Sequence, residues 1–272
     1  MPTPRSGLAA GVVNGTLYAV GGNYTTGPVE AYDPITDMWR TKAPLPTWRY
    51  GLGVGIVNGI LYAVGGYSGG AVGTLEAYDP VTDTWTTRAS MPTARYYVAA
   101  GVVNGILYAV GGAGAGGGVI GTVEAYDPST DTWTTKASLP TARYGVGVGV
   151  VNGILYAVGG FSAAGSALMV VDAYDPATDT WTRKASMPTA RGDLAVGVVN
   201  GILYAVGGSS PSPTGTALAT LEAYDPATDT WTTKPSMPTA RTALAAGVFN
   251  GILYAVGGYV ANSLATLEVY QP

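Results

Sequence analysis

Six arginines recur at nearly regular spacing and offer the clearest binding chemistry in the chain. Each closes a box of the form Met/Leu-Pro-Thr-X-Arg, and the six are Arg5, Arg49, Arg95, Arg143, Arg191 and Arg241. A guanidinium group presents a planar fork of N–H donors that matches a carboxylate or a phosphate. Charge-assisted hydrogen bonds of this kind contribute about 1.5–3 kcal/mol each. The boxes therefore predict an anion site wherever the fold brings the arginines together.

Aromatic residues flank several of these arginines and are candidates to contact the same ligand. Tyr50, Tyr96 and Tyr144 each follow an arginine directly, Tyr97 follows Tyr96, and Trp48 precedes one of the arginines. An aromatic ring beside an arginine suits a sugar or a peptide, because the ring offers a flat apolar face with a polar edge. The alternative is that these rings only cap the core.

Acidic residues give weaker signals. An acid opens each box of the type Glu-Ala-Tyr-Asp-Pro, so Arg–Glu pairing is a structural alternative to ligand binding, and exposed pairs contribute only about 0–1 kcal/mol. Asp193 is the single acid outside the repeated positions, and its Arg-Gly-Asp tripeptide fits a chance match because the repeat already requires Arg191. The paired aspartates of Asp-Pro-Ala-Thr-Asp fit turn capping better than calcium binding. We therefore predict no metal site.

Composition excludes several classes of function. The 272 residues include 11% charged residues and carry a net charge of -4, which argues against a nucleic-acid partner. Without His or Cys, the chain lacks the commonest neutral-pH base and all thiol chemistry. No apolar stretch is long enough to predict a membrane span, and no segment resembles an export signal. The compartment stays open.

Internal repeats organise the sequence. The string Asn-Gly-X-Leu-Tyr-Ala-Val-Gly-Gly occurs six times, each time followed by the acidic box, and five of the six acidic boxes lead on to a Trp. Within one unit, Gly-rich residues 51–57, the run 60–66, residues 74–79 and residues 84–90 read as four short strands. Asn58-Gly59 predicts a tight hairpin turn between the first two strands, because both residues tolerate positive φ. Four antiparallel strands per unit are typical of a propeller blade.

These boxes resemble the kelch repeat: the double Gly, the Tyr of the acidic box and the spaced Trp all match it along nearly the whole chain. The resemblance implies an all-β, six-bladed kelch β-propeller with four antiparallel strands per blade. We expect one domain over residues 1–272, with repeats at about 5–48, 49–94, 95–142, 143–190, 191–240 and 241–272. In this family, arginines at the same box help receive acidic peptides. The loops that flank that pocket here carry no charge, so no specific partner follows.

The last repeat stops before its Trp, so the last blade is expected to lack its outermost strand. Residues 266–270 would then form an open edge. We expect a monomer, with pairing of two chains through this edge as the alternative. The near identity of the units also indicates recent amplification or engineering.

We therefore expect a non-enzymatic binding scaffold that recognises an acidic peptide, carboxylate, phosphate or other polar ligand on the face where the arginine boxes lie, with no cofactor. One alternative is an enzyme of the sialic-acid mutarotase type, which also occurs among kelch propellers. In it, the arginines would hold a carboxylate while Asp193 or a Glu moves a proton. A second alternative is an engineered or newly amplified propeller with no natural ligand.

Overall fold

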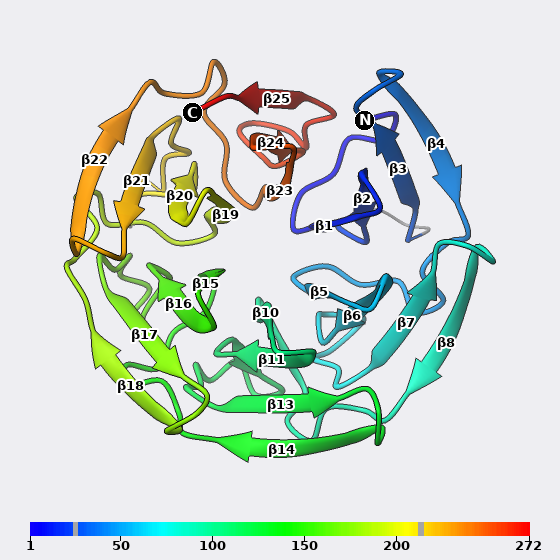
Figure 1. Cartoon of the computed structure of the whole chain (residues 1–272), viewed down its shortest axis with the longest axis horizontal. Helices are drawn as coiled ribbons and strands as arrows, with labels where there is room; N and C mark the ends of the chain where they lie inside the picture. Colours follow the sequence, from blue (N-terminus) through cyan, green and yellow to red (C-terminus); the bar gives the residue numbers. More distant parts are fainter. Residues whose placement is uncertain (24–26, 212–214) are drawn as a thin grey trace.

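Six antiparallel sheets stand around a central channel in this computed structural model, which describes residues 1–23, 27–211 and 215–272 (Figure 1). Five sheets have four strands and the sixth has three, so the predicted six-bladed propeller with an incomplete last blade is confirmed. Within the described residues every regular element is a strand. We number the blades in chain order.

Each blade runs from the channel to the rim. The strands nearest the channel are β1 (Ala9–Val13), β5 (Gly53–Val57), β10 (Ala99–Val103), β15 (Gly147–Val151), β19 (Ala195–Val199) and β23 (Ala245–Phe249). The second strands are β2 (Thr16–Val20), β6 (Ile60–Val64), β11 (Ile106–Val110), β16 (Ile154–Val158), β20 (Ile202–Val206) and β24 (Ile252–Val256). The third strands are β3 (Val29–Asp33), β7 (Leu75–Asp79), β13 (Val123–Asp127), β17 (Val171–Asp175), β21 (Leu221–Asp225) and β25 (Leu267–Tyr270). The rim strands are β4 (Met38–Lys42), β8 (Thr84–Arg88), β14 (Thr132–Lys136), β18 (Thr180–Arg183) and β22 (Thr230–Lys234). A further short pair, β9 (Arg95–Tyr96) and β12 (Ala113–Gly114), joins the loops of blade 3.

The hairpin between the first two strands of each blade follows the prediction from its Asn-Gly pair. Asn58 and Gly59 have φ angles of 49° and 79°, the left-handed values that a type I′ turn requires. The first strand is rich in glycine because neighbouring blades meet there at close range. A Cβ atom on Gly55 would lie 2.3 Å from Cδ1 of Leu107 in the next blade. Gly therefore sets the narrow spacing of blades around the channel.

At the rim, a Tyr–Trp pair and an aspartate fasten each of blades 2 to 5 to the blade before it. Tyr126 and Trp133 in blade 3 have ring centroids 5.2 Å apart, and the Trp133 Nε1–H donates to the carbonyl of Ala89 in blade 2 at 2.8 Å. Asp131 accepts hydrogen bonds from the Tyr126 hydroxyl at 2.6 Å and from the Ala89 amide at 2.9 Å. The turn between the third and fourth strands thus binds both its own blade and its neighbour.

The ring closes without a rim strand in blade 6. The amino group of Met1 donates to the Ala265 carbonyl at 2.8 Å, and the Arg5 amide donates to the Leu264 carbonyl at 3.0 Å. The Gly258 amide donates in turn to the Arg5 carbonyl at 2.8 Å. The equivalent three hydrogen bonds hold the Met91–Arg95 box, which links blade 2 to blade 3, against blade 2. Residues 1–5 therefore occupy, beside blade 6, the place that this linking box occupies beside blade 2.

A closed circle of backbone hydrogen bonds also joins all six blades at one end of the channel. Its members stand two residues after the box arginines, except that Val98 donates in place of Tyr97. The amide-to-carbonyl links are Gly51 to Gly7, Val98 to Gly51, Gly145 to Tyr97, Asp193 to Gly145, Ala243 to Asp193 and Gly7 to Ala243. Their donor–acceptor distances lie between 2.7 and 3.3 Å. We call the face that contains this circle, the arginine boxes and the loops between second and third strands the upper face.

Candidate functional site at the channel mouth

The box arginines lie beneath the upper face, inside the protein. All six side chains have 0% of their surface exposed, and each pairs with the acid at the second position of the third strand of its own blade. Arg95 shows the arrangement: its Nη2 donates to Glu124 at 2.7 Å, and its Nη1 donates to the Thr122 carbonyl at 2.5 Å. Burial lowers the pKa of Arg95 to about 10, and the Glu124 carboxylate opposes that shift.

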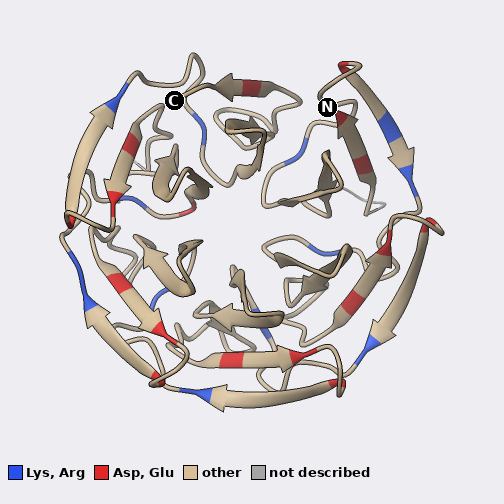
Figure 2. Ribbon diagram, in the orientation of Figure 1, with Lys and Arg blue, Asp and Glu red and all other residues tan. Residues whose placement is uncertain are grey.

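This burial corrects the expectation that Arg5, Arg49, Arg95, Arg143, Arg191 and Arg241 bind a ligand. Their guanidinium forks are used by protein carboxylates and carbonyls, so they present no cationic ring to solvent. The Arg–Glu alternative describes them instead. The remaining cations, among them Arg88 and Lys136, lie on or next to the rim strands, as the blue segments of the outer ring in Figure 2 show. An anion at the channel mouth would therefore meet little positive charge.

Aromatic side chains form a connected arc on one half of the upper face. Tyr50 contacts Trp48, Tyr67 and Tyr97, with ring centroids 6.3, 5.3 and 6.2 Å away. The arc continues through Tyr96 and Tyr97 to Tyr144 and Phe161. We call these seven rings, Trp48, Tyr50, Tyr67, Tyr96, Tyr97, Tyr144 and Phe161, the aromatic arc. The structure thus brings the predicted residues Tyr50, Tyr96 and Tyr144 together.

Two residues that reach the channel mouth had only a secondary place in the sequence analysis, Tyr97 as a neighbour of Tyr96 and Asp193 as the proton-moving acid of the mutarotase alternative. Tyr97 and Asp193 occupy the position two residues after the box arginine, which is glycine in three of the six boxes. Both have positive φ, 49° and 50°, a conformation that costs a non-glycine residue free energy. The signal that could have found them is that they break an otherwise regular repeat at a shared position.

Asp193 is half-buried at the mouth, and burial raises the pKa of its carboxyl to about 6. A Cβ atom on Gly145 would lie 2.3 Å from Oδ1 of Asp193, so the carboxyl group occupies space that only a glycine leaves open. Burial, and after it the charge of Asp193, raises the pKa of the Tyr97 hydroxyl above its usual range. The mouth therefore combines one carboxyl group that titrates near neutral pH with phenol groups that stay protonated.

Replacement of Asp193 by Asn should stabilise the protein near neutral pH. The carboxyl pKa rises from 3.8 to about 6 on folding, so the native state binds more protons than the unfolded chain between these pH values. Wild-type stability should therefore fall as pH rises from about 4 to about 6, whereas the Asn variant has nothing to titrate, and Asn tolerates positive φ. We expect Asp193→Asn to be more stable by about 1–3 kcal/mol at pH 7.5 and equally stable at pH 3.5 in urea unfolding. A less stable variant at pH 7.5 would mean that the carboxylate makes a stabilising contact.

Two cavities open at this mouth and share Gly7, Tyr97 and Ala243. One has a volume of about 200 Å³ and is also lined by Ser6, Asn23 and Tyr50. The other, of about 80 Å³, is lined by residues of the hydrogen-bonded circle, including Asp193. Together they form a polar basin with an aromatic wall on one side.

In residues 1–23, 27–211 and 215–272, no three His, Cys, Asp or Glu side chains come together in a group that could hold a metal ion. Within the same residues no helix has the length and apolar character needed to cross a membrane.

Comparison with known proteins supports the same architecture. The model of the KLHDC2/KLHL20/DRC7 Kelch-repeats domain matches residues 87–258, and the Kelch motif matches residues 4–46 and 49–92. The solved structure of YjhT superposes with a TM-score of 0.87 at 18% sequence identity, covering 100% of this chain and 96% of that one. No curated protein sequence matches the chain.

One expectation from the sequence is overturned by this comparison. We expected a protein that is not an enzyme, because His and Cys are absent. YjhT has the same fold over 96% of its length and is a sialic-acid mutarotase, so this architecture carries catalysis, and the expectation was wrong. An identity of 18% establishes a shared fold alone. Since the two Kelch descriptions together match residues 4–46, 49–92 and 87–258, the chain belongs to the Kelch-repeat family.

Proposed function

We propose that this propeller binds a small sugar-like ligand in the basin at the channel mouth. The observation that supports the proposal most is where the repeat is broken. Blade interiors are almost identical, whereas the two positions that follow each box arginine vary from blade to blade, and Tyr50, Tyr97 and Asp193 at these positions line the opening. Residues that depart from a regular scaffold at a shared concave surface are candidates for function rather than for packing.

The chemistry of the basin suits a neutral polyhydroxylated molecule. Aromatic rings of the arc offer flat apolar faces for the C–H face of a sugar ring, and Asp193 accepts hydrogen bonds from hydroxyl groups. Ser6 and Asn23 add polar groups to the lining of the basin. The six box arginines are buried and paired with carboxylates, and Asp193 is charged above pH 6. The basin therefore favours a neutral ligand over an anion.

A second candidate function is proton transfer on a bound sugar. The carboxyl pKa of about 6 places Asp193 near the value at which a group both gives and takes protons efficiently at neutral pH. Mutarotation of a sugar needs such a group beside the ring oxygen and the anomeric hydroxyl. The arginines that the mutarotase alternative assigned to a sugar carboxylate are buried, so a neutral sugar is the better substrate for this site.

Titration calorimetry with D-glucose, D-galactose, N-acetylneuraminic acid and inorganic phosphate tests the binding proposal. We expect a neutral sugar to bind, and Tyr50→Ala to weaken binding about threefold to tenfold through the lost ring contact. Asp193→Asn should weaken it about tenfold, because charge-assisted hydrogen bonds become neutral ones. Tyr259→Ala is the matched control, since Tyr259 holds the repeat position of Tyr67 on blade 6 and is 44% exposed.

Two outcomes would contradict the proposal: phosphate or N-acetylneuraminic acid binding while neutral sugars do not, or binding that is insensitive to both variants. Exchange between sugar anomers, followed by NMR, tests the catalytic candidate separately. Acceleration that disappears in Asp193→Asn supports proton transfer at this site. Binding without acceleration rejects catalysis and leaves the binding proposal intact.

A further inference from the structure

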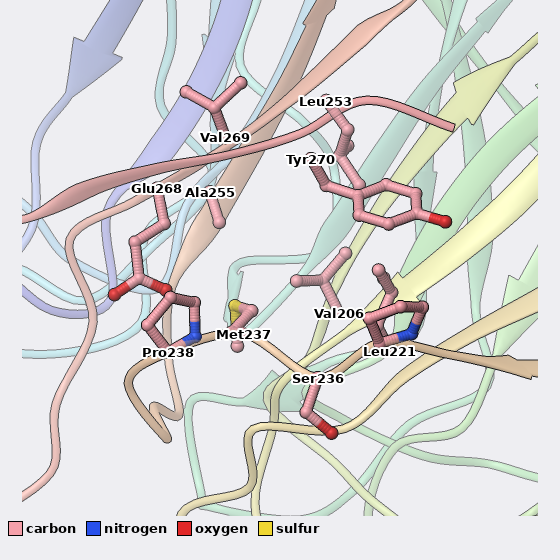
Figure 3. Close-up of a pocket in the computed structure, with 11 residues that line it drawn as sticks. Val206, Leu221, Ser236, Met237, Pro238, Leu253, Ala255, Glu268, Val269 and Tyr270 are labelled. Carbon is pink, nitrogen blue, oxygen red and sulfur yellow. The ribbon is translucent and has the colours of Figure 1, made fainter.

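The rim opens between blade 6 and blade 1, where the ring has no outer strand in the described residues. β25 pairs with β24 on its inner side, and no fourth strand of the described residues lies on its outer side, where the outer ring is interrupted between β22 and β4 (Figure 1). A groove of about 340 Å³ runs beside β25, between the linker residues 235–238 and the side chains of Tyr270, Leu221 and Val206 (Figure 3). Val269 on β25 is 57% exposed, whereas its counterparts in the other blades are buried alanines.

The other blades show which side chain fills the equivalent of this groove. In blade 3, Trp133 lies against Tyr126 and hydrogen-bonds the Ala89 carbonyl of the blade before it. The same two contacts recur for Trp85, Trp181 and Trp231. In blade 6 the corresponding groups are the ring of Tyr270 and the carbonyl of Pro235, and both line the groove. The groove therefore has the surroundings of a Trp side chain.

The opposite wall of the opening has the complementary groups. In the complete blades, the residue that follows the rim strand uses its carbonyl and its amide to contact the next blade. Ala137 accepts from Trp181 Nε1 at 2.8 Å and donates its amide to Asp179 at 2.9 Å. Trp39 and Asp37 of blade 1 hold the equivalent repeat positions at the opening. A strand laid along β25 would meet anchoring groups at both its ends.

Two residues in this region differ from their counterparts in the other blades. The differences remove contacts to the turn between the third and rim strands and keep the contacts to the rim strand itself. Pro235 replaces the alanine whose amide donates to the turn aspartate in other blades, and proline has no amide hydrogen. Gln271 replaces the aspartate that opens the turn and caps it, as Asp225 caps the Ala227 amide. The carbonyl that receives Trp Nε1 is retained at Pro235. The site thus fits a strand that arrives without the turn that precedes it elsewhere.

From these contacts we infer that the rim opening is a docking site for an extended segment of a partner polypeptide that carries one Trp. The segment adds antiparallel to β25, as β22 adds to β21, with its Trp opposite Tyr270 and its indole N–H donated to the Pro235 carbonyl. Backbone hydrogen bonds to the open edge supply affinity, and the Trp groove supplies selectivity.

The peptide Thr-Asp-Thr-Trp-Thr-Thr-Lys-Ala-Ser, which copies residues 130–138, is the probe. We expect the fluorescein-labelled peptide to bind the 272-residue chain in a saturable one-to-one manner, measured by anisotropy. Its Trp→Ala version should bind at least about tenfold more weakly, because it leaves the groove empty. A version with N-methyl groups on alternate backbone nitrogens should lose binding through the lost strand pairing. Both changes are in the peptide, so they leave the protein fold untouched.

Variants of the protein locate the site. Tyr270→Ala should weaken peptide binding, whereas Val260→Ala, an exposed loop residue of the same blade, should not. Equal binding of the Trp and Ala peptides, or no binding of either, would overturn the inference. So would a dimer of the chain that persists, in sedimentation, at saturating peptide, because a second copy of β25 would then be the occupant.

Discussion

Replacement of Arg95 by Met should lower the free energy of unfolding by about 3–5 kcal/mol. The guanidinium group is fully buried and its removal leaves the Glu124 carboxylate, which is 2% exposed, as an unpaired charge in the interior. It also removes the donors to the Thr122 and Gly111 carbonyls. Urea unfolding followed by Trp fluorescence measures the loss. Arg95→Lys should fall between wild type and Met, because a single ammonium cannot reproduce the planar fork.

Arg88→Met is the control for this experiment. Arg88 lies exposed at the end of the rim strand β8, so its replacement should change stability by no more than about 0.5 kcal/mol. A loss below about 1 kcal/mol in Arg95→Met, joined to a loss of anion binding, would restore the original hypothesis of a ligand-binding arginine. The two hypotheses therefore predict opposite patterns of stability and binding.

The architecture could be predicted because every strand is marked by a local signal. Asn58 and Gly59 set a hairpin by their own φ preferences, and a run such as Ile60–Val64 is too apolar to stand at the surface. Because the unit recurs along the chain, the strand assignment made for one unit applies to all six. Even the missing strand follows from the absence of a Trp after Tyr270.

Burial of the arginines could not be predicted in the same way, because exposure of a long side chain depends on what packs above it. The backbone carbonyls that accept from Arg95 come from Thr122 and Gly111, which are distant in sequence and meet only when loops dock. Pairing of the box arginine with the acid was an alternative in the sequence analysis. The choice between pairing and ligand binding depends on which loops cover the arginine on the upper face. For the same reason, Phe161 joined the aromatic arc unforeseen, since it lies in a loop of variable length.

Asp193 shows what a regular repeat can reveal once its geometry is known. In the sequence it is a lone acid in an Arg-Gly-Asp tripeptide. In the fold, the repeat position two residues after each arginine lies on the closed circle of backbone hydrogen bonds, so any side chain there reaches the channel mouth. The six residues at this position are Gly7, Gly51, Tyr97, Gly145, Asp193 and Ala243, so at Tyr97 and Asp193 the scaffold carries added chemistry.

The close docking of neighbouring blades leads to the second large effect: Gly111→Ala should lower stability by about 2–4 kcal/mol. Gly111 has a φ of 61°, and a Cβ atom there would lie 2.5 Å from the carbonyl oxygen of Arg143. That oxygen cannot retreat freely, because it accepts a hydrogen bond from the Gly112 amide at 3.0 Å that joins blade 3 to the next linker. Backbone strain of about 1 kcal/mol and overpacking of about 1–3 kcal/mol therefore add.

Gly105→Ala separates these two contributions. Gly105 lies in the same blade with a φ of 78°, and a Cβ atom there would meet nothing within 4 Å. It should lose only the strain, about 1 kcal/mol. Urea unfolding of both variants gives the free energy of the close approach as their difference. Equal losses would mean that the Arg143 carbonyl moves aside without cost. The strands nearest the channel and the rim contacts would then hold the blades together. The double glycine would be needed only because its backbone adopts positive φ angles.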